Sequence, residues 1–306
     1  MASPLSMGIV GAGAMGAKHA RTLASLPGVR VARIIDRDIE RARAVAAEVQ
    51  AQASATCRDL PGTASAAVVA VPASEHHAVA CELLRAGVHL LVEKPLAADA
   101  AQAEELRSLA HHHGCLLQVG HIERFNPAFH ALHKAIVGPR FLRFERRSPF
   151  TGRGTDVDVF CDLMIHDLDL ALALTGAPVR SVEARAWPPP PELAHVGWAR
   201  LVFEDGVAAE FFATRLAAAP ARTIQVISDG ALGEADLLTR AVRILRGPAD
   251  GQVAFRAAEG EDALRSQDRA FLDALTGRGP VPVDGEAGVR AVRLTERVRS
   301  AAGGSR

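Results

Sequence analysis

An aspartate and a histidine four positions apart, Asp162 and His166, lie in a segment that is otherwise almost wholly apolar. At about 100° per residue of helix, these side chains and Asp169 share one narrow stripe, while leucine, isoleucine and methionine cover most other faces. Burying such groups costs on the order of several kcal/mol unless each has a partner or a task. The pattern therefore predicts that the stripe lines an internal cavity.

In such a cavity His166 could act as a general base, and Asp162 could orient and stabilise it. Both residues are also candidates for contact with a substrate. The alternative is structural: Asp162 lies near a capped helix start and His166 is a satisfied core histidine. Three polar groups in register on an apolar helix favour the catalytic interpretation.

Lys94 is one of three lysines, with Lys18 and Lys134, in a chain whose other strong bases are arginines. A desolvated lysine can release its proton near neutral pH, whereas arginine cannot. Lys94 follows directly after an apolar strand pattern at residues 88–92, and ligands of open parallel sheets bind beyond the carboxyl ends of the strands. We therefore expect Lys94 at the mouth of a site, polarising a substrate oxygen or joining a proton relay. The next residue, Pro95, restricts the backbone at this position, and the peptide bond before it can be cis.

The sequence GAGAMG at residues 11–16 lies between a short apolar run at residues 5–10 and a helical pattern that reaches residue 26. In this context the glycines permit a tight turn, a close approach of the backbone to a pyrophosphate, and close packing of helix on strand. The amides at the helix N-terminus would bind the phosphates. The pattern predicts a dinucleotide-binding fold.

Asp36 ends a second strand pattern at residues 29–35, twenty positions beyond Gly16. Its carboxylate would accept hydrogen bonds from the adenosine ribose and repel a 2′-phosphate, which favours NAD, although Arg37 leaves NADP open. His76 could contact the nicotinamide half of the cofactor or simply cap a helix at the surface. The expected cofactor contacts are Gly11, Gly13, Ala14, Met15, Gly16, Asp36, Arg37, Val71, Pro72, His76, Glu93 and Lys94.

Strand and helix patterns alternate up to residue 119, which predicts a doubly wound parallel α/β sheet for residues 1–121. Beyond Gly176 the strand patterns follow one another without intervening helices, which indicates an antiparallel sheet in a second domain, residues 122–306. The expected strands there are residues 140–147, 179–187, 197–203, 207–214, 222–228 and 240–245. Two helices, 261–276 and 285–301, close the chain, and the last could pack back on the first domain.

Several arginines and an asparagine that precede the Asp162–His166 helix are candidates for binding a substrate. Arg124 and Asn126 would position the substrate or the nicotinamide, with Asn126 also capping a helix that begins at Pro127. Arg153, with Arg146 and Arg147, borders a loop at residues 148–155 and could hold substrate phosphates. Ordinary surface arginines are an equally good interpretation of these three.

Composition narrows the class of protein further. The chain has 306 residues, 49% of them hydrophobic, and its 35 basic and 35 acidic side chains cancel, which gives no reason to expect nucleic acid or an anionic membrane as partner. The four cysteines and the scattered histidines lack metal-type spacing, so we predict no metal site and expect reduced thiols in a cytoplasmic protein. No segment has the length and apolar character of a membrane span or an export signal.

Three motifs in order, residues 11–16, Glu93-Lys94-Pro95 and the Asp162-x-x-x-His166 helix, resemble the glucose–fructose oxidoreductase, inositol dehydrogenase and MocA (Gfo/Idh/MocA) family over essentially the whole chain. The resemblance implies an NAD-dependent oxidoreductase with an N-terminal Rossmann domain. It also implies a C-terminal α/β domain with an open, mainly antiparallel sheet that forms a homodimer or homotetramer.

Residues 119–127 and 162–169 are similar to the nucleotide-sugar branch of that family. This implies oxidation of a secondary hydroxyl of a UDP-sugar, such as C3 of UDP-N-acetylglucosamine in a lipid A type pathway. Such an oxidation needs a hydride acceptor, a base and a positive charge near the alkoxide, which NAD, His166 with Asp162, and Lys94 would supply. A free sugar, an inositol or another small carbonyl compound is the alternative substrate. A non-catalytic NAD sensor or scaffold is the alternative of another class.

Overall fold

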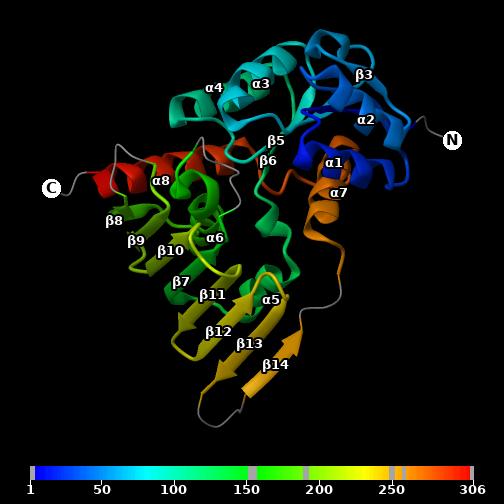
Figure 1. Cartoon of the computed structure of the whole chain (residues 1–306). Coiled ribbons are helices and arrows are strands. Elements are labelled where there is room, and N and C mark those ends of the chain that lie inside the picture. The colour runs from blue at the N-terminus through cyan, green and yellow to red at the C-terminus, as the bar shows by residue number, and fades with distance from the viewer. Residues whose placement is uncertain (1–3, 151–156, 189–192, 248–251, 257–259, 304–306) are drawn as a thin grey trace. The chain divides into compact units, whose positions relative to one another are not determined.

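The computed structural model describes residues 4–150, 157–188, 193–247, 252–256 and 260–303 (Figure 1). The chain divides into two compact units, the first formed by Met1–Ile122 and Leu264–Val292, the second by Glu123–Ala263 and Arg293–Arg306. The boundary expected after residue 121 lies next to this division. Leu264–Val292, which we expected in the second domain, belongs to the first unit.

The first unit contains a six-stranded parallel sheet in the order β3-β2-β1-β4-β5-β6. Its strands are β1 (Leu5–Val10), β2 (Val29–Ile35), β3 (Gln52–Ser54), β4 (Ala66–Val69), β5 (His89–Glu93) and β6 (Leu117–Gly120). The chain order reverses between β1 and β4, the place where such sheets bind ligands at their carboxyl edge. The predicted doubly wound sheet is confirmed, and only the short β3 was not expected.

Five helices accompany this sheet: α1 (Ala14–Ala24), α2 (Ile39–Val49), α3 (His76–Arg85), α4 (Ala100–His112) and α7 (Ala263–Leu275). The side chains of Asp38 and Asp99 accept backbone amide hydrogen bonds at the starts of α2 and α4, which explains where these helices begin. Although α7 is distant in sequence, it lies beside α1 in both ribbon views (Figure 1). Its Phe271 and Leu272 join the same buried cluster as Ile9 of β1.

The second unit contains an eight-stranded sheet in the order β14-β13-β12-β11-β7-β10-β9-β8. Its strands are β7 (Pro139–Arg147), β8 (Val179–Trp187), β9 (Val196–Phe203), β10 (Ala208–Thr214), β11 (Ala221–Ser228), β12 (Ala231–Asp236), β13 (Ala241–Arg246) and β14 (Gln252–Arg256). Neighbouring strands are antiparallel except β7 and β10, which are parallel. The mainly antiparallel sheet is confirmed, but the sequence patterns did not indicate β12 and β14.

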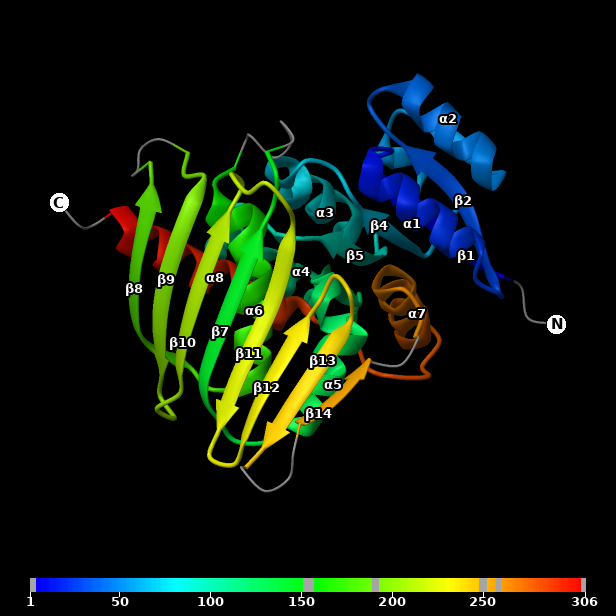
Figure 2. The ribbon, with the colours of Figure 1, turned by 60° about the horizontal axis from the view of Figure 1, so that its bottom comes forward.

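Helices α5 (Pro127–Ala135), α6 (Ile165–Thr175) and the end of α8 (Gly285–Gly303) supply the core on one side of this sheet. The rings of Phe144 on β7 and Phe211 on β10 stack in that core with centroids 5.0 Å apart. Gly233 of β12 lets α5 approach, because an added Cβ would lie 2.5 Å from the side chain of Leu132. In Figure 2 the face turned toward the viewer carries no helix among the described residues.

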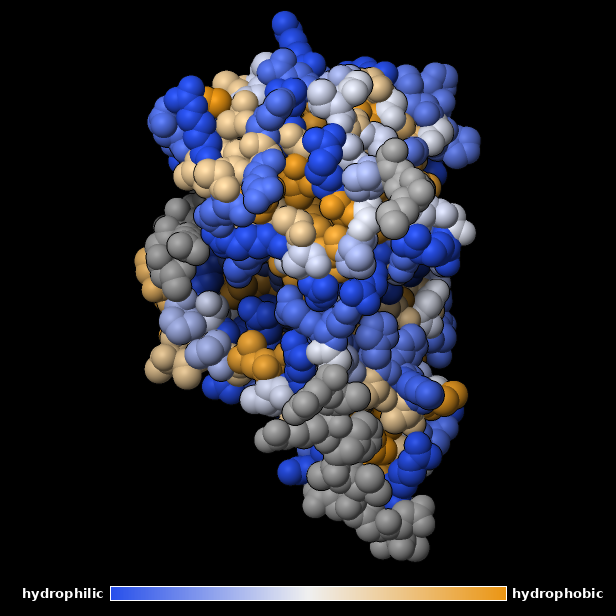
Figure 3. Space-filling model, turned by 90° about the vertical axis from the view of Figure 1, so that its right-hand side faces the viewer, coloured by the Kyte–Doolittle hydropathy of each residue, from blue (hydrophilic) through white to orange (hydrophobic). Residues whose placement is uncertain are grey.

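The surface is mostly polar on the face shown in Figure 3, with hydrophobic residues gathered in smaller patches. In the part of the chain that the structure describes, no helix combines the length and apolar character needed to cross a membrane.

Candidate functional site

A cavity of about 770 Å³ opens at the carboxyl ends of β1, β2, β4 and β5 in the first unit. Every predicted cofactor contact lines it except Gly16. The structure thus brings together the glycine turn, the acid after β2, and Glu93 and Lys94 after β5, although these segments are far apart in sequence. A cleft at the reversal point of a parallel sheet is the expected place for a dinucleotide.

The three glycines of the turn between β1 and α1 have different structural roles. Gly11 has a φ of +96°, and a Cβ there would lie 2.5 Å from the carbonyl oxygen of Ala70. A Cβ on Gly16 would lie 1.7 Å from the oxygen of Gly11, so this glycine permits the helix to pack on the turn. Gly13 has no atom within 4 Å of such a Cβ, and no side chain caps α1 behind it. Open space above uncapped helix amides fits a pyrophosphate.

Asp36 is held in position for a ribose by backbone amides. Its Oδ2 accepts a hydrogen bond from the amide of Ala12 at 2.8 Å, and its Oδ1 accepts one from the amide of Asp38 at 2.9 Å. The neighbouring cation Arg37 pairs with Glu75 at 2.7 Å. A second cation of this wall, Arg41, lies 3.6 Å from Asp36 and 3.3 Å from Asp38. Both arginines therefore have acidic partners, and the carboxylate of Asp36 is placed to accept hydrogen bonds from a ribose.

Beneath Lys94 lies a buried chain of ionisable groups that we did not predict. His19 of α1 contacts Glu93 through Nε2 at 3.0 Å and Asp268 of α7 through Nδ1 at 2.8 Å. Glu93 in turn accepts a hydrogen bond from the backbone amide of Lys94 at 3.3 Å. Local sequence offers one signal, the place of His19 on the inward face of the helix after the glycine turn. Asp268 offers none, because its partner is 249 positions away.

Burial alone would lower the pKa of His19, but the charge and the hydrogen bonds of Asp268 and Glu93 raise it to about 10. Burial alone would raise the pKa of Glu93, but the hydrogen bond and charge of His19 bring it below the ordinary value. Both effects have the same cause, a fully buried imidazolium between two carboxylates. The backbone that carries Lys94 therefore rests on an ionised network.

His76 lies at the start of α3 and is 1% exposed, so the surface role that we considered for it is wrong. Its Nδ1 lies 2.6 Å from the carbonyl oxygen of Pro95 and its Nε2 lies 3.0 Å from that of Val71. Burial lowers the pKa of His76 although both contacts oppose it. The ring joins the segments after β4 and β5, where the Lys94–Pro95 bond is cis.

The stripe pattern assumed a regular α-helix from Asp162 onward. The segment of the second unit that carries Asp162 and His166 is not regular in this way. A π-helical stretch covers Phe160–Met164, and α6 begins only at Ile165. A π-helix turns through a smaller angle per residue than an α-helix, so the predicted stripe does not continue unchanged through this stretch.

Asp158, which we did not single out, caps this segment in place of Asp162. Its Oδ1 accepts hydrogen bonds from the amides of Phe160 and Cys161, both at 3.0 Å. Its Oδ2 accepts one from Arg299 Nε at 2.6 Å. Asp162 is thereby left to other contacts: its side chain is 28% exposed and lies 3.3 Å from the buried guanidinium of Arg215.

His166 is half-buried on the first turn of α6, whereas the third member of the stripe, Asp169, is 1% exposed. Arg124 donates two hydrogen bonds to Asp169, at 2.7 and 3.0 Å. The carboxylate of Asp169 is therefore satisfied by Arg124, and the prediction that the stripe lines a cavity stays a prediction. The bidentate contact also takes up one edge of the guanidinium that we predicted to bind substrate.

Asn126 caps α5 as predicted, accepting the amide of Ala128 at 3.0 Å. Its amide nitrogen donates to Glu123 at 3.1 Å and to the carbonyl of Leu237 at 3.0 Å. These contacts fix the turn that carries Arg124, and the role of Asn126 toward a substrate stays a prediction.

Arg146 is 3% exposed and pairs with Asp167 at 2.7 Å and with Glu123 at 3.1 Å. Burial would lower the pKa of Arg146, but these carboxylates raise it, so the guanidinium stays charged. The pairing leaves Arg146 inside the unit rather than beside a substrate phosphate, as we had considered. Arg153 lies outside the described residues.

Comparisons with known proteins agree with this geometry. The family model for oxidoreductases with an NAD-binding Rossmann fold, GFO_IDH_MocA, matches residues 5–121, and that for the GFO/IDH/MocA C-terminal domain matches residues 137–243. UDP-N-acetylglucosamine 3-dehydrogenase of Acidithiobacillus ferrooxidans is 34% identical over 96% of each chain. Its solved structure has a TM-score of 0.92 and covers 98% of both chains.

More distant relatives carry other substrates in their names. Inositol 2-dehydrogenase of Corynebacterium glutamicum is 33% identical over 64% of this chain and 61% of its own. The structure of GenD2 from gentamicin A biosynthesis, solved in complex with NAD, is 25% identical, has a TM-score of 0.87 and covers 100% of this chain and 96% of its own. Since both halves of the sequence match the family models and a relative aligns along the entire chain, the protein belongs to the Gfo/Idh/MocA family of NAD-binding oxidoreductases.

Proposed function

We propose that the protein is an NAD-dependent dehydrogenase that oxidises the secondary hydroxyl at C3 of UDP-N-acetylglucosamine. The observation that carries the proposal is the end-to-end alignment, 96% of both chains, with a relative that bears this activity in its name. The named inositol relative aligns with only 61% of its own length. We further propose that the ketone product feeds a lipid A type pathway in the cytoplasm, where the scattered cysteines would stay reduced.

The reaction breaks the C3–H bond and the O–H bond of the same carbon and leaves a ketone. NAD, held by the glycine turn and Asp36, would supply the hydride acceptor for this bond. His166 takes the hydroxyl proton, and Asp162 stabilises the imidazolium that forms. The Lys94 ammonium stabilises negative charge on the oxygen as that proton leaves. The proposal requires Lys94 and His166 to act on one hydroxyl.

Substrate binding in this proposal rests on Arg124, Asn126 and Arg153. Arg124 keeps 21% of its side chain exposed while paired with Asp169, which leaves part of the guanidinium for the substrate. Asn126 acts by fixing the turn that carries Arg124. Arg153 binds the diphosphate, for which a guanidinium has suitable geometry.

A substrate screen tests the proposal directly. Purified protein with NAD is assayed for NADH absorbance against UDP-N-acetylglucosamine, UDP-glucose, N-acetylglucosamine and myo-inositol. We expect turnover with UDP-N-acetylglucosamine, a product oxidised at C3 by mass spectrometry and NMR, and a lower kcat/KM with NADP. A higher kcat/KM with a free sugar or with myo-inositol would contradict the nucleotide-sugar proposal.

The inositol relative favours a second candidate, a dehydrogenase of inositols or free sugars on the same scaffold. That enzyme would turn over without a UDP group, so the same screen separates the two. A non-catalytic NAD sensor would bind NADH and oxidise no compound in the panel.

A further inference from the structure

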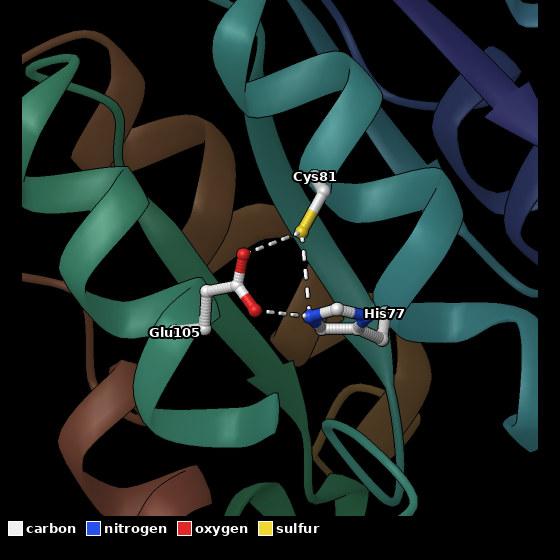
Figure 4. Close-up of side chains that lie close together, drawn as sticks. All are labelled: His77, Cys81 and Glu105. Atoms are coloured by element: carbon white, nitrogen blue, oxygen red, sulfur yellow. Dashed lines mark hydrogen bonds and ion pairs between the residues drawn. The ribbon is translucent and has the colours of Figure 1, made fainter. Parts of the chain in front are cut away.

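Three side chains that can bind a metal ion come together between α3 and α4 of the first unit. His77 and Cys81 are four positions apart on α3 and so lie on one face of that helix, while Glu105 projects from α4 (Figure 4). His77 and Cys81 do not line the nucleotide cavity, and neither does Glu105. No local sequence pattern indicates the cluster, because Glu105 is 24 positions from Cys81.

The distances between the ligand atoms lie within about half an ångström of those in a tetrahedral zinc site. Nε2 of His77 lies 3.5 Å from Sγ of Cys81 and 2.9 Å from Oε2 of Glu105, and the sulfur lies 3.9 Å from Oε1. Zinc bonds of about 2.0–2.3 Å at tetrahedral angles separate their ligand atoms by roughly 3.4–3.6 Å. Shifts of about half an ångström would place all three atoms around one ion.

The chemistry and exposure of the three groups suit the same ion. Thiolate, imidazole and carboxylate are the three protein ligands that zinc uses, and two ligands spaced by four positions on a helix are a recurring zinc arrangement. Cys81 is 4% exposed, whereas the side chains of His77 and Glu105 are 27% and 48% exposed. The sulfur thus forms the floor of the cluster and the other two form its rim, so that water can complete the coordination.

One cation competes for the carboxylate. Nη2 of Arg85 lies 3.5 Å from Oε1 of Glu105, but the Arg85 side chain is 57% exposed. An ion pair between an exposed guanidinium and an exposed carboxylate contributes little to stability, so the arginine can move away from Glu105 toward the solvent. Arg85 therefore does not block the site.

We propose that His77, Cys81 and Glu105 bind one zinc-class divalent cation, with water as the fourth ligand. The ion would join α3 to α4. Because His76 and Val79 of α3 line the nucleotide cavity, the ion would stabilise the helix that forms one wall of that cavity without contacting the cofactor.

The test uses the full-length protein without an affinity tag, stripped with a chelator and then titrated with Zn²⁺ or Co²⁺. We expect one equivalent to bind, a thiolate-to-cobalt charge-transfer absorption, and a higher melting temperature with Zn²⁺. Cys81→Ser should remove the absorption. His77→Ala and Glu105→Gln should each weaken Zn²⁺ binding at least about tenfold, since even residues beyond the direct ligands change metal affinity by that factor.

Matched controls locate the ion. Cys115→Ser alters another buried cysteine, and a triple alanine variant at residues 111–113 removes the histidine run at the end of α4. Both should bind like the wild type. Loss of binding in either control, retention of the cobalt band in Cys81→Ser, or affinity only in the millimolar range would overturn the proposal. Glu105→Gln keeps the interpretation independent of folding, because that side chain is partly exposed.

Discussion

Lys94 and His166 carry the proposed proton transfer, and single substitutions test each of them. We expect His166→Ala and Lys94→Ala to lower kcat by about 100-fold or more, since a positioned acid or base contributes about 10²–10⁴. NADH binding, measured by fluorescence titration, should stay largely intact. His133→Ala and Lys134→Ala alter exposed residues of the same types and should leave kcat unchanged. Near-normal turnover in either test variant would refute its role.

His19 makes stability depend on pH in a defined direction. Its pKa is raised from 6.5 to about 10, so its contribution to the free energy of unfolding is complete below about pH 6.5. The contribution declines as the pH rises toward 10, because the folded chain then also loses the proton. Glu93 has a lowered pKa, and its contribution is lost instead as the pH falls below its ordinary value of 4.5.

Replacing His19 should therefore cost more stability at pH 7 than at pH 10. We expect His19→Gln to lower the free energy of unfolding by about 3 kcal/mol at pH 7, because two carboxylates stay buried without their cation. Denaturant titrations of wild type and variant at pH 7 and pH 10 measure the difference. A gap that widens toward pH 10 would rule out a charged His19.

At the scale of elements, the turn between β1 and α1 separates folding from cofactor binding. Gly16→Ala puts a methyl group against the backbone oxygen of Gly11, where little can give way, so we expect a loss of about 3 kcal/mol. Gly13→Ala meets nothing within 4 Å and should unfold like the wild type while binding NADH more weakly. Thermal unfolding and NADH titration of both variants provide the check. Equal stability of the two would contradict the assigned roles.

Elements marked by local patterns could be predicted from the sequence, and those that depend on distant partners could not. The strand patterns at residues 5–10, 29–35 and 179–187 coincide with β1, β2 and β8. β12 could not be predicted from strand propensity, because it contains Gly233, a residue type that is unfavourable in strands. The structure explains this glycine by the close packing of α5 against it. Asp158, which caps the π-helical stretch, also pairs with Arg299, 141 positions away, and no local pattern indicates this contact.

The candidate site shows the same division. The glycine turn, Asp36 and Lys94 could be recognised from their spacing and sequence context, and they line one cavity as the patterns indicated. The pairings of Arg124 with Asp169 and of Arg146 with Asp167 could not be recognised in this way, because a sequence shows a charged side chain but not its partner in the fold. Residues predicted to bind a substrate were therefore harder to place than those predicted to bind the dinucleotide.

At the scale of the whole molecule, we propose that the helix-free face of the eight-stranded sheet joins two copies of the chain. Trp198 of β9 and Phe212 of β10 are cross-strand neighbours, and Phe212 is 36% exposed. We expect a dimer or tetramer by light scattering and a shift to monomer in Trp198→Glu or Phe212→Glu. Val137→Glu changes a hydrophobic residue that is 85% exposed outside the sheet and should not alter the mass. Wild-type mass in both sheet variants would exclude this face.

The first unit takes Leu264–Val292 from the far end of the chain. This segment supplies Asp268 to His19, and Val283 accepts a hydrogen bond from the amide of Val119 at 2.8 Å. A nascent polypeptide therefore cannot finish this unit until residues 264–292 have left the ribosome. A fragment that stops at residue 263 should aggregate or fail to retain NADH, whereas two separately expressed pieces, 1–263 and 264–306, should regain NADH affinity when mixed.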